Sequence, residues 1–212
     1  MYVIGITGGS GAGKGLICEI LAEHGIASID TDKVSRQVCG PGSPCLSELA
    51  EAFGEGILTE KGELDRGGLA ALVFLEPEEE KRQRLLGIMN RITHKHILKA
   101  CESWLEERRR NGEAAAAVDA PLLFESGFDA RCDCIWGVTA PRETRIRRIM
   151  RRDGISEALA AGRIDSQKSD DFFYKNCDAV IVNGTTRANA EKQVTRLLSE
   201  YLKSDENKRS RG

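Results

Sequence analysis

A glycine-rich segment near the amino terminus constrains the fold more than any other part of this chain. Residues 8–15 read GGSGAGKG and follow a short apolar run at residues 3–6. Glycines allow the backbone to curl so that successive N–H groups point inward at an anion. A helix starting at the end of the loop adds its positive end, and Lys14 can reach the terminal phosphates. This strand, loop and helix predict a site for nucleotide phosphates.

The residue after the lysine departs from the usual phosphate-binding pattern. The two end glycines and Lys14 have the expected spacing, but Gly15 stands where Ser or Thr normally offers a hydroxyl to Mg²⁺. Apolar residues spaced along one face still predict a helix directly after the loop. We therefore favour a phosphate-binding loop over a plain glycine turn, and we expect its metal shell to be altered.

A dinucleotide-binding dehydrogenase is the alternative from another class. The loop contains part of a GxGxxG frame, and the acidic Asp30 lies about twenty residues further on, as that fingerprint requires. A frame that starts at Gly9 would need glycine at position 14, where Lys14 would crowd the contact between strand and helix. The chain also contains no Tyr-x-x-x-Lys pair for hydride transfer. The lysine thus favours phosphoryl transfer.

Charge, hydropathy and cysteine spacing narrow the class of protein. The net charge of −2 gives no attraction to nucleic acid or to an anionic membrane. No apolar run approaches the ~18 residues that span a bilayer, and the first strand begins too early for a signal peptide. Cys132 and Cys134 are spaced wrongly for a zinc pair. We expect a cytoplasmic monomer or weak homo-oligomer with reduced thiols, no metal–thiolate site, and no nucleic-acid or membrane partner.

Short apolar runs separated by helical stretches predict the fold class. Such runs are typical of a parallel sheet that is buried on both faces. The sequence therefore predicts a three-layer α/β core with a five-stranded parallel sheet, whose ligands lie beyond the carboxyl ends of the strands. The runs are at residues 3–6, 26–29, 114–118, 135–139 and 179–182.

The other segments are predicted to be arranged around this core. Residues 36–112 are too many for one crossover helix, and their helical patterns predict an insertion that closes over a second substrate. Residues 143–176 are expected to form a helical lid, and the charged residues 203–212 a disordered tail. The core itself is predicted to comprise residues 1–35, 113–142 and 177–202.

Carboxylates follow two of the predicted strands. In an extended chain, Asp30 and Asp32 would lie on the same side, so that one could accept a proton from a hydroxyl while the other binds water or metal. The alternative is a helix N-cap, which needs only one of them. Asp119 directly follows the third run, where phosphate-binding enzymes carry an acidic residue near Mg²⁺, and a loop cap before Pro121 is its alternative.

A basic helix is predicted over residues 142–152, which hold six arginines. Arg145, Arg148 and Arg152 share one face of it, beside an apolar stripe. A solvated face and a nucleic-acid surface are the alternatives, but one helix without interleaved aromatic residues supports the latter poorly. Next to a phosphate-binding loop we favour an arginine lid, with Arg148 and Arg152 neutralising charge on the transferred phosphate.

Taken together, these residues resemble the dephospho-coenzyme A kinase family over nearly the whole chain, from Ile4 to Leu198. The most family-specific parts are the Asp-x-Asp pair and the run PLLFE at residues 121–125. The chain departs from the family pattern at Gly15 and at Lys95, where proline is usual. Other matching segments are the glycine-rich loop, Arg36-Gln37, NRITH at 90–94, RIMRRD at 148–153, residues 163–167 and VIVNG at 180–184.

The resemblance implies ATP-dependent phosphorylation of the ribose 3′-hydroxyl of dephospho-CoA, which gives coenzyme A and ADP and uses Mg²⁺. Asp32 would be the catalytic base, acting with Lys14 and Arg148. His94, which alone would read as a structural side chain, then becomes an acceptor ligand. The implied acceptor ligands are Thr7, Asp32, Arg36, His94 and Leu123. The implied ATP ligands are Gly9, Ser10, Gly11, Ala12, Gly13, Lys14, Gly15, Leu16, Arg148 and Arg152, with Asn183 and Gly184 near the adenine. Asp119 would act on Mg²⁺ indirectly, through water.

Two other functions stay open on the sequence alone. The Gly-Lys-Gly loop also resembles that of nucleoside monophosphate kinases, but such an enzyme leaves the Asp-x-Asp pair and the PLLFE run unexplained. A non-enzymatic nucleotide switch would be favoured if Gly15 abolished turnover. Turnover with dephospho-CoA, AMP or neither as acceptor separates the three.

Overall fold

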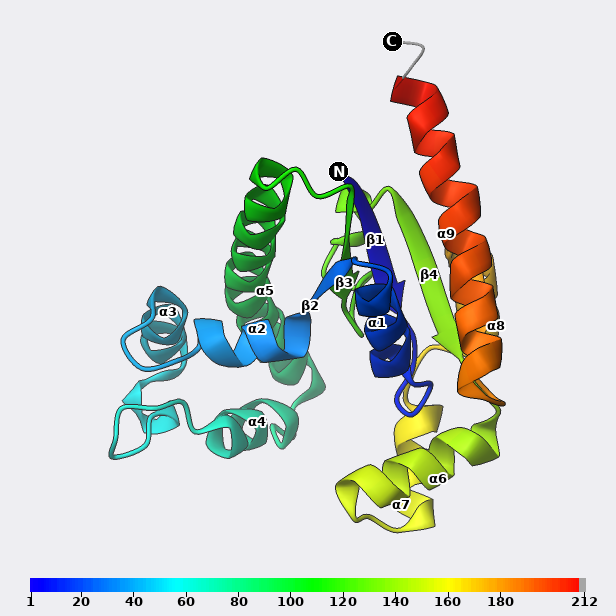
Figure 1. Ribbon diagram of the computed structural model, residues 1–212. Helices are drawn as coiled ribbons and strands as arrows, with labels where there is room; N and C mark the ends of the chain where they lie inside the picture. Colours follow the sequence, from blue (N-terminus) through cyan, green and yellow to red (C-terminus); the bar gives the residue numbers. More distant parts are fainter. Residues whose placement is uncertain (210–212) are drawn as a thin grey trace. The chain divides into compact units, whose positions relative to one another are not determined.

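Five strands form one sheet in the order β2-β3-β1-β4-β5 in this computed structural model, which describes residues 1–209, with side chains to residue 200 (Figure 1). Strand β1 pairs in parallel with β3 and β4, and β4 pairs in parallel with β5. The predicted α/β class with a five-stranded parallel sheet is confirmed. The strands are Tyr2–Thr7 (β1), Ala27–Asp30 (β2), Ala115–Asp119 (β3), Cys134–Thr139 (β4) and Ala179–Val182 (β5).

The chain divides into two compact units, one of residues 30–106 and the other of residues 1–29 with those from 107 onward. The helical insertion thus starts and ends about six residues earlier than residues 36–112. Helices of the sheet-containing unit are α1 (Lys14–Glu23), α6 (Arg142–Asp153), α7 (Glu157–Asp165), α8 (Asp170–Asn176), α9 (Arg187–Arg209) and the 3₁₀ turn Asp129–Arg131. The insertion holds α2 (Thr31–Val38), α3 (Pro44–Phe53), the 3₁₀ turn Glu55–Ile57, α4 (Arg66–Phe74) and most of α5 (Glu79–Arg110).

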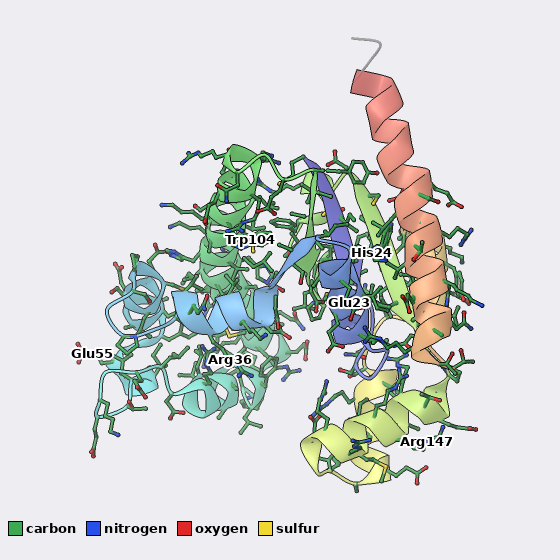
Figure 2. All side chains as sticks on the ribbon, in the orientation of Figure 1. Glu23, His24, Arg36, Glu55, Trp104 and Arg147 are labelled. Atoms are coloured by element: carbon green, nitrogen blue, oxygen red, sulfur yellow. The ribbon has the colours of Figure 1, made fainter. Side chains whose placement is uncertain are left out.

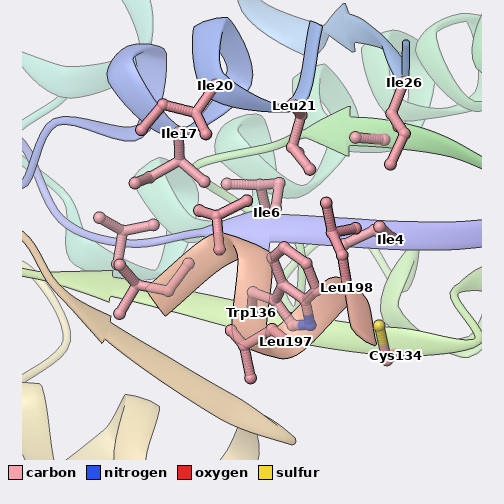
Figure 3. Packing of buried hydrophobic residues seen from close by; sticks show 14 of the residues in the cluster. Ile4, Ile6, Ile17, Ile20, Leu21, Ile26, Cys134, Trp136, Leu197 and Leu198 are labelled. Atoms are coloured by element: carbon pink, nitrogen blue, oxygen red, sulfur yellow. The ribbon is translucent and has the colours of Figure 1, made fainter. Parts of the chain in front are cut away.

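One face of the sheet packs against α1 and α9. Alternate residues of β1, including Ile4 and Ile6, meet Ile17 and Ile20 of α1, with the fully buried Trp136 of β4 at the centre (Figure 3). Residues two apart on a strand face the same side, so the intervening residues serve the opposite face. Because apolar residues occupy both sets, the central strands read as continuous apolar runs.

The opposite face is approached closely where two strands carry glycine. A Cβ added at Gly5 would lie 2.8 Å from Sγ of Cys132, and one at Gly137 would lie 3.1 Å from Cβ of Phe173. Both distances are tighter than ordinary van der Waals contact. These glycines therefore let the loop after β3 and helix α8 pack directly on the strands.

The carboxyl-terminal helix reaches into the segment predicted to be a tail. Helix α9 continues to Arg209, and the predicted disorder from residue 203 stays a prediction. Lys, Glu and Arg are good helix formers, and neither proline nor glycine interrupts this stretch. Residues 210–212 lie outside the described part. Among the described residues, no helix combines the length and apolar character needed to cross a membrane.

The helical insertion has its own apolar core. Leu49 of α3, Ile57, and Leu69 and Val73 of α4 are buried together. Helix α5 runs through Lys95 without a break, and Nζ of Lys95 lies 2.8 Å from Oε1 of Glu48 on α3. That contact lowers the pKa of the Glu48 carboxyl. Lysine at the position where the family usually has proline thus links α5 to α3.

Candidate active site

The phosphate-binding loop connects the central strand to the first helix, as predicted. Strand β1 ends at Thr7, and α1 begins at Lys14 with Gly13 as its N-cap. Gly13 has a φ of 92°, and within the described chain no side chain caps the first amides of the helix. The amides that an α-helix leaves unpaired at its start are the groups that bind anions. The helix start is therefore arranged to receive phosphate.

Four loop glycines, Gly8, Gly9, Gly11 and Gly13, are required by their surroundings, and Gly15 is not. A Cβ at Gly8 would overlap the carbonyl oxygen of Val138, and one at Gly13 would overlap the side-chain amide of Asn183. Gly9 is blocked by a guanidinium, described below. In contrast, Gly15 is exposed and has nothing within 4 Å of an added Cβ. Packing therefore does not explain why a hydroxyl residue is missing there.

Lys14 and Asp119 lie at the entrance to the loop. Nζ of Lys14 is 3.9 Å from Oδ1 of Asp119 and 3.3 Å from the carbonyl oxygen of Gly8. Both side chains are largely buried, and Asp119 ends β3 beside β1. A cation and a carboxylate therefore meet at the carboxyl ends of two neighbouring strands, as the sequence predicts.

The site offers few protein ligands to a metal ion. No group of three or more His, Cys, Asp or Glu side chains that could hold a metal occurs within residues 1–200. Mg²⁺ commonly binds through one or two carboxylates together with substrate phosphates and water. Asp119 beside a phosphate site fits that arrangement.

The arginines predicted for the lid divide into two groups. Arg148 donates from Nη1 to the carbonyl oxygens of Gly11 and Ala12, at 3.2 and 3.1 Å. Arg152 instead donates to Asp153 within the lid, at 2.7 Å from its Nε. That hydrogen bond, with a second from Arg163, lowers the pKa of Asp153 to about 2. Arg148 therefore contacts the loop, whereas Arg152 pairs within α6, and the bond from Arg163 to Asp153 joins α7 to α6.

Asn183 also contacts the loop. Its buried side chain donates from Nδ2 to the carbonyl oxygens of Ala12, at 2.9 Å, and Gly13, at 3.4 Å. Gly184 packs on the proline ring of Pro141, where an added Cβ would lie 2.6 Å from Cδ. The structure thus gives Asn183 a direct contact with the phosphate loop, and its predicted place near adenine stays a prediction.

The predicted geometry of the Asp-x-Asp pair is wrong. Helix α2 begins at Thr31, so Asp32 lies in its first turn and not in an extended chain. The Asp30 carboxylate caps the helix, accepting from the amides of Asp32 at 2.9 Å and Lys33 at 3.2 Å. Two satisfied amides favour the cap over extension. Asp32 is exposed, and Arg36 follows one turn later on α2 (Figure 2).

The other predicted acceptor ligands occupy different environments. His94 is half-buried on α5 of the helical insertion. Thr7 lies at the end of β1 and donates from Oγ1 to the carbonyl of Pro121, at 3.5 Å. Leu123 is fully buried, and its role as an acceptor ligand stays a prediction. Its packing against Gly5 removes the side chain from any surface.

A cavity of about 300 Å³ opens beside the glycine-rich loop. Phe124 and Phe172 meet edge to face in its wall, with ring centroids 5.2 Å apart. Nζ of Lys168 lies 4.9 Å from the centroid of Phe172 and 4.0 Å from Oε1 of Glu125. The lining consists of Thr7, Gly8, Gly9, Pro121, Leu122, Phe124, Glu125, Ser166, Gln167, Lys168, Phe172 and Phe173.

Sequence reasoning missed the residues that the lid contributes to this region. Arg145 was grouped with its neighbours, yet it is the buried arginine of α6, with 4% of its surface exposed. Gln167 and Phe172 carried no signal beyond lying in or near a matching segment. Leu122 is exposed and Leu123 is buried, and because both are leucines the sequence carries no signal that separates them.

Gly13→Ala should abolish tight ATP binding, because it combines a strained φ with an overlap with Asn183. We expect the dissociation constant for ATP, measured by calorimetric titration, to rise at least about tenfold. Gly25→Ala is the matched control, since Gly25 has a φ of 77° but open space around an added Cβ. It should lose about 1 kcal/mol of stability and no ATP affinity. Equal ATP affinities for the two variants would contradict the assigned role of Gly13.

Comparison with known proteins agrees with this geometry. The CoaE family model, dephospho-CoA kinase, matches residues 2–198. A dephospho-CoA kinase of Corynebacterium glutamicum is 37% identical over 202 residues, covering 95% of this chain and 98% of the relative. One of Moorella thermoacetica is 38% identical over 185 residues, covering 87% and 84%. The crystal structure of TT1252 from Thermus thermophilus aligns with a TM-score of 0.76 at 29% identity, covering 94% and 97%. The chain belongs to the dephospho-CoA kinase family.

Proposed function

We propose that this chain transfers the terminal phosphoryl group of ATP to the ribose 3′-hydroxyl of dephospho-CoA. The observation that carries the proposal is the glycine loop with uncapped helix amides, next to Lys14 and Asp119, in a member of this family. Phosphoryl transfer depends mainly on positioning and on neutralising charge, and a loop with a lysine provides both.

The loop amides and Lys14 would hold the β- and γ-phosphates. Lys14 is a flexible cation that can leave Asp119 for phosphate, since its Nζ is 3.9 Å from the carboxylate. Asp119 and water would hold Mg²⁺, which neutralises phosphate charge when bound. Gly15 supplies no hydroxyl, so more of the ion's shell would be water.

The cavity beside the loop would take the adenosine part of the acceptor. The reacting hydroxyl belongs to the ribose, so the adjoining base must lie within a nucleoside's length of the transferred phosphate. A wall that contains Phe124 and Phe172 offers apolar surface to a flat ring. A volume of about 300 Å³ is at the lower end of typical ligand sites.

Asp32 would accept the proton of the 3′-hydroxyl. Its carboxylate is exposed at the start of α2, two residues past β2, and its own side chain is not the cap of that helix. Arg36, one turn further on the same helix, would pair with an acceptor phosphate, with His94 as a further ligand. Closure over both substrates would exclude water and prevent wasteful hydrolysis of ATP.

We place the enzyme in the cytoplasm, where thiols stay reduced. Sγ of Cys39 lies 3.4 Å from Sγ of Cys45, yet the two are free thiols. Burial raises the pKa of Cys45 to about 12, which keeps that thiol protonated and unreactive.

Dephospho-CoA should be the acceptor that supports ATP consumption. We expect turnover with dephospho-CoA and little or none with AMP or other nucleoside monophosphates, measured by coupled ADP release. The product should carry its new phosphate on the 3′-oxygen, read by ³¹P NMR. Preferred turnover of a nucleoside monophosphate would make the chain a nucleotide kinase, and ATP binding without any turnover would make it a switch.

Asp32→Asn should lower kcat by about 10²–10⁴-fold, because a general base of this kind contributes that much. ATP affinity should stay within about twofold of the wild type. Asp30→Asn is the matched control, since asparagine keeps the oxygen that caps α2. A wild-type rate for Asp32→Asn, or an equal loss in both variants, would remove Asp32 from the role of base.

Gly15→Ser should lower the Mg²⁺ concentration required for half-maximal rate, because serine can offer its hydroxyl to the ion. Gly15→Ala adds a Cβ without the hydroxyl, and the open space at this position admits both side chains. Both variants should also gain up to about 1 kcal/mol of stability, since glycine is a poor helix residue. Identical Mg²⁺ titrations for the two variants would show that the missing hydroxyl has no effect.

A further inference from the structure

Ser10 of the glycine loop has all three of its polar atoms bound by lid-side residues. Its amide donates to Oε1 of Gln167 at 2.8 Å, and its carbonyl oxygen accepts from Nε of Arg145 at 2.9 Å. Its hydroxyl oxygen accepts from Nε2 of Gln167 at 3.2 Å. Nη2 of Arg145 also donates to Oε1 of Gln167, at 3.2 Å. The two side chains therefore form one hydrogen-bonded unit around Ser10.

Arg145 is also packed against the glycines on either side of Ser10. A Cβ added at Gly9 would overlap its Nη2, and one at Gly11 would lie 2.6 Å from its carbonyl oxygen. The guanidinium is buried, and its remaining ion-pair partner is Asp170, with Nη1 3.4 Å from Oδ1. A buried charge is costly unless it is hydrogen-bonded, and this one is bonded chiefly to the loop and to Gln167.

Consecutive loop carbonyls are held by donors outside the loop. Arg145 binds the carbonyl of Ser10, Arg148 those of Gly11 and Ala12, and Asn183 those of Ala12 and Gly13. In a trans peptide the C=O and the following N–H point in opposite directions. Holding these carbonyls outward therefore directs the amides of residues 11, 13 and 14 inward, while the amide of Ala12 donates to the carbonyl oxygen of Gly9 at 3.1 Å and closes the turn. The inward amides form the concave anion site of such a loop.

We propose that Arg145 is a positioning residue for ATP. Together with Gln167 it fixes the peptides around Ser10, so that the loop amides are already directed at the phosphates before the nucleotide binds. The role differs from that of a lid arginine that touches phosphate, because Arg145 acts through the backbone. It deepens the proposed function by assigning the preorganisation of the ATP site to the base of the lid, and it rests only on ATP binding at this loop.

Arg145→Met tests the proposal with Arg147→Met as its matched control. Arg147 lies on the same helix (Figure 2), is exposed, and donates only to Oγ1 of Thr144 among the contacts that the structure gives it. We expect Arg145→Met to weaken binding of ATP and of inorganic tripolyphosphate by about tenfold each, equivalent to about 1.4 kcal/mol. Arg147→Met should leave both affinities unchanged. Tripolyphosphate reports on the anion site alone.

The steady-state readout separates positioning from general damage. Arg145→Met should raise the KM for ATP while the KM for dephospho-CoA stays within about twofold of the wild type. A variant that melts at a lower temperature but binds tripolyphosphate as tightly as the wild type would reduce Arg145 to a structural role, and would overturn the proposal. The proposal would also be overturned if Arg145→Met weakened the binding of adenosine as much as the binding of tripolyphosphate, because adenosine carries no phosphate.

A second pair of variants keeps the test decisive if Arg145→Met does not fold. Gln167→Glu retains an oxygen for the Ser10 amide and for Arg145, whereas Gln167→Leu retains neither. The proposal expects the leucine variant to lose several-fold more tripolyphosphate affinity than the glutamate variant, and equal affinities would contradict it. These titrations need no acceptor. If the wild-type protein binds ATP but does not phosphorylate dephospho-CoA, the proposed function is disproved and this inference still stands.

Discussion

The close approach of a glycine loop to helix α6 is the contact on which the candidate site depends. Guanidinium and amide donors hold the loop carbonyls, and the glycines exist where those donors leave no room for a Cβ. Gly9 and Gly13 therefore serve two needs at once: they permit a curled backbone, and they admit the side chains that keep it curled, while Gly11 admits the backbone of α6 at Arg145. An anion site built this way does not require phosphate to organise it, because the cost of ordering has been met during folding.

The same hydrogen bonds couple the conformation of the phosphate loop to the position of helices α6 and α7. Arg145 and Arg148 are on α6, and Gln167 follows α7, so any movement of this helical pair changes the hydrogen bonds that shape the loop. The ion pair of Asp153 on α6 with Arg163 on α7 joins the two helices to each other. Helices α6 and α7, the predicted lid, are thus connected to the phosphate loop by hydrogen bonds and to each other by an ion pair.

The sheet could be predicted from the sequence because its strands are buried on both faces and read as continuous apolar runs. The loop could be predicted because phosphate binding sets the spacing of its glycines and lysine. Other features depend on which of two local arrangements is more stable, and a sequence pattern does not decide between them. Asp30 satisfies two helix amides, so the chain turns helical before Asp32. Arg145 and Arg148 share one helix face, and only the packing shows that Arg145 is buried. Leu123 belongs to a family-specific run, but its side chain packs on a strand glycine.

Gly15 differs from the other glycines of the loop. Every other glycine discussed at the loop is held in place by a neighbour, whereas Gly15 is exposed with open space around it. The backbone would accept a serine, so the loss of the hydroxyl belongs to the chemistry of the site and not to its packing. Mg²⁺ parts with its water reluctantly, and an ion held by phosphates, water and Asp119 needs little from the helix. A loop already organised by Arg145, Arg148 and Asn183 does not need a metal–hydroxyl bond to keep its shape. This outer support gives a physical reason why the hydroxyl could be lost.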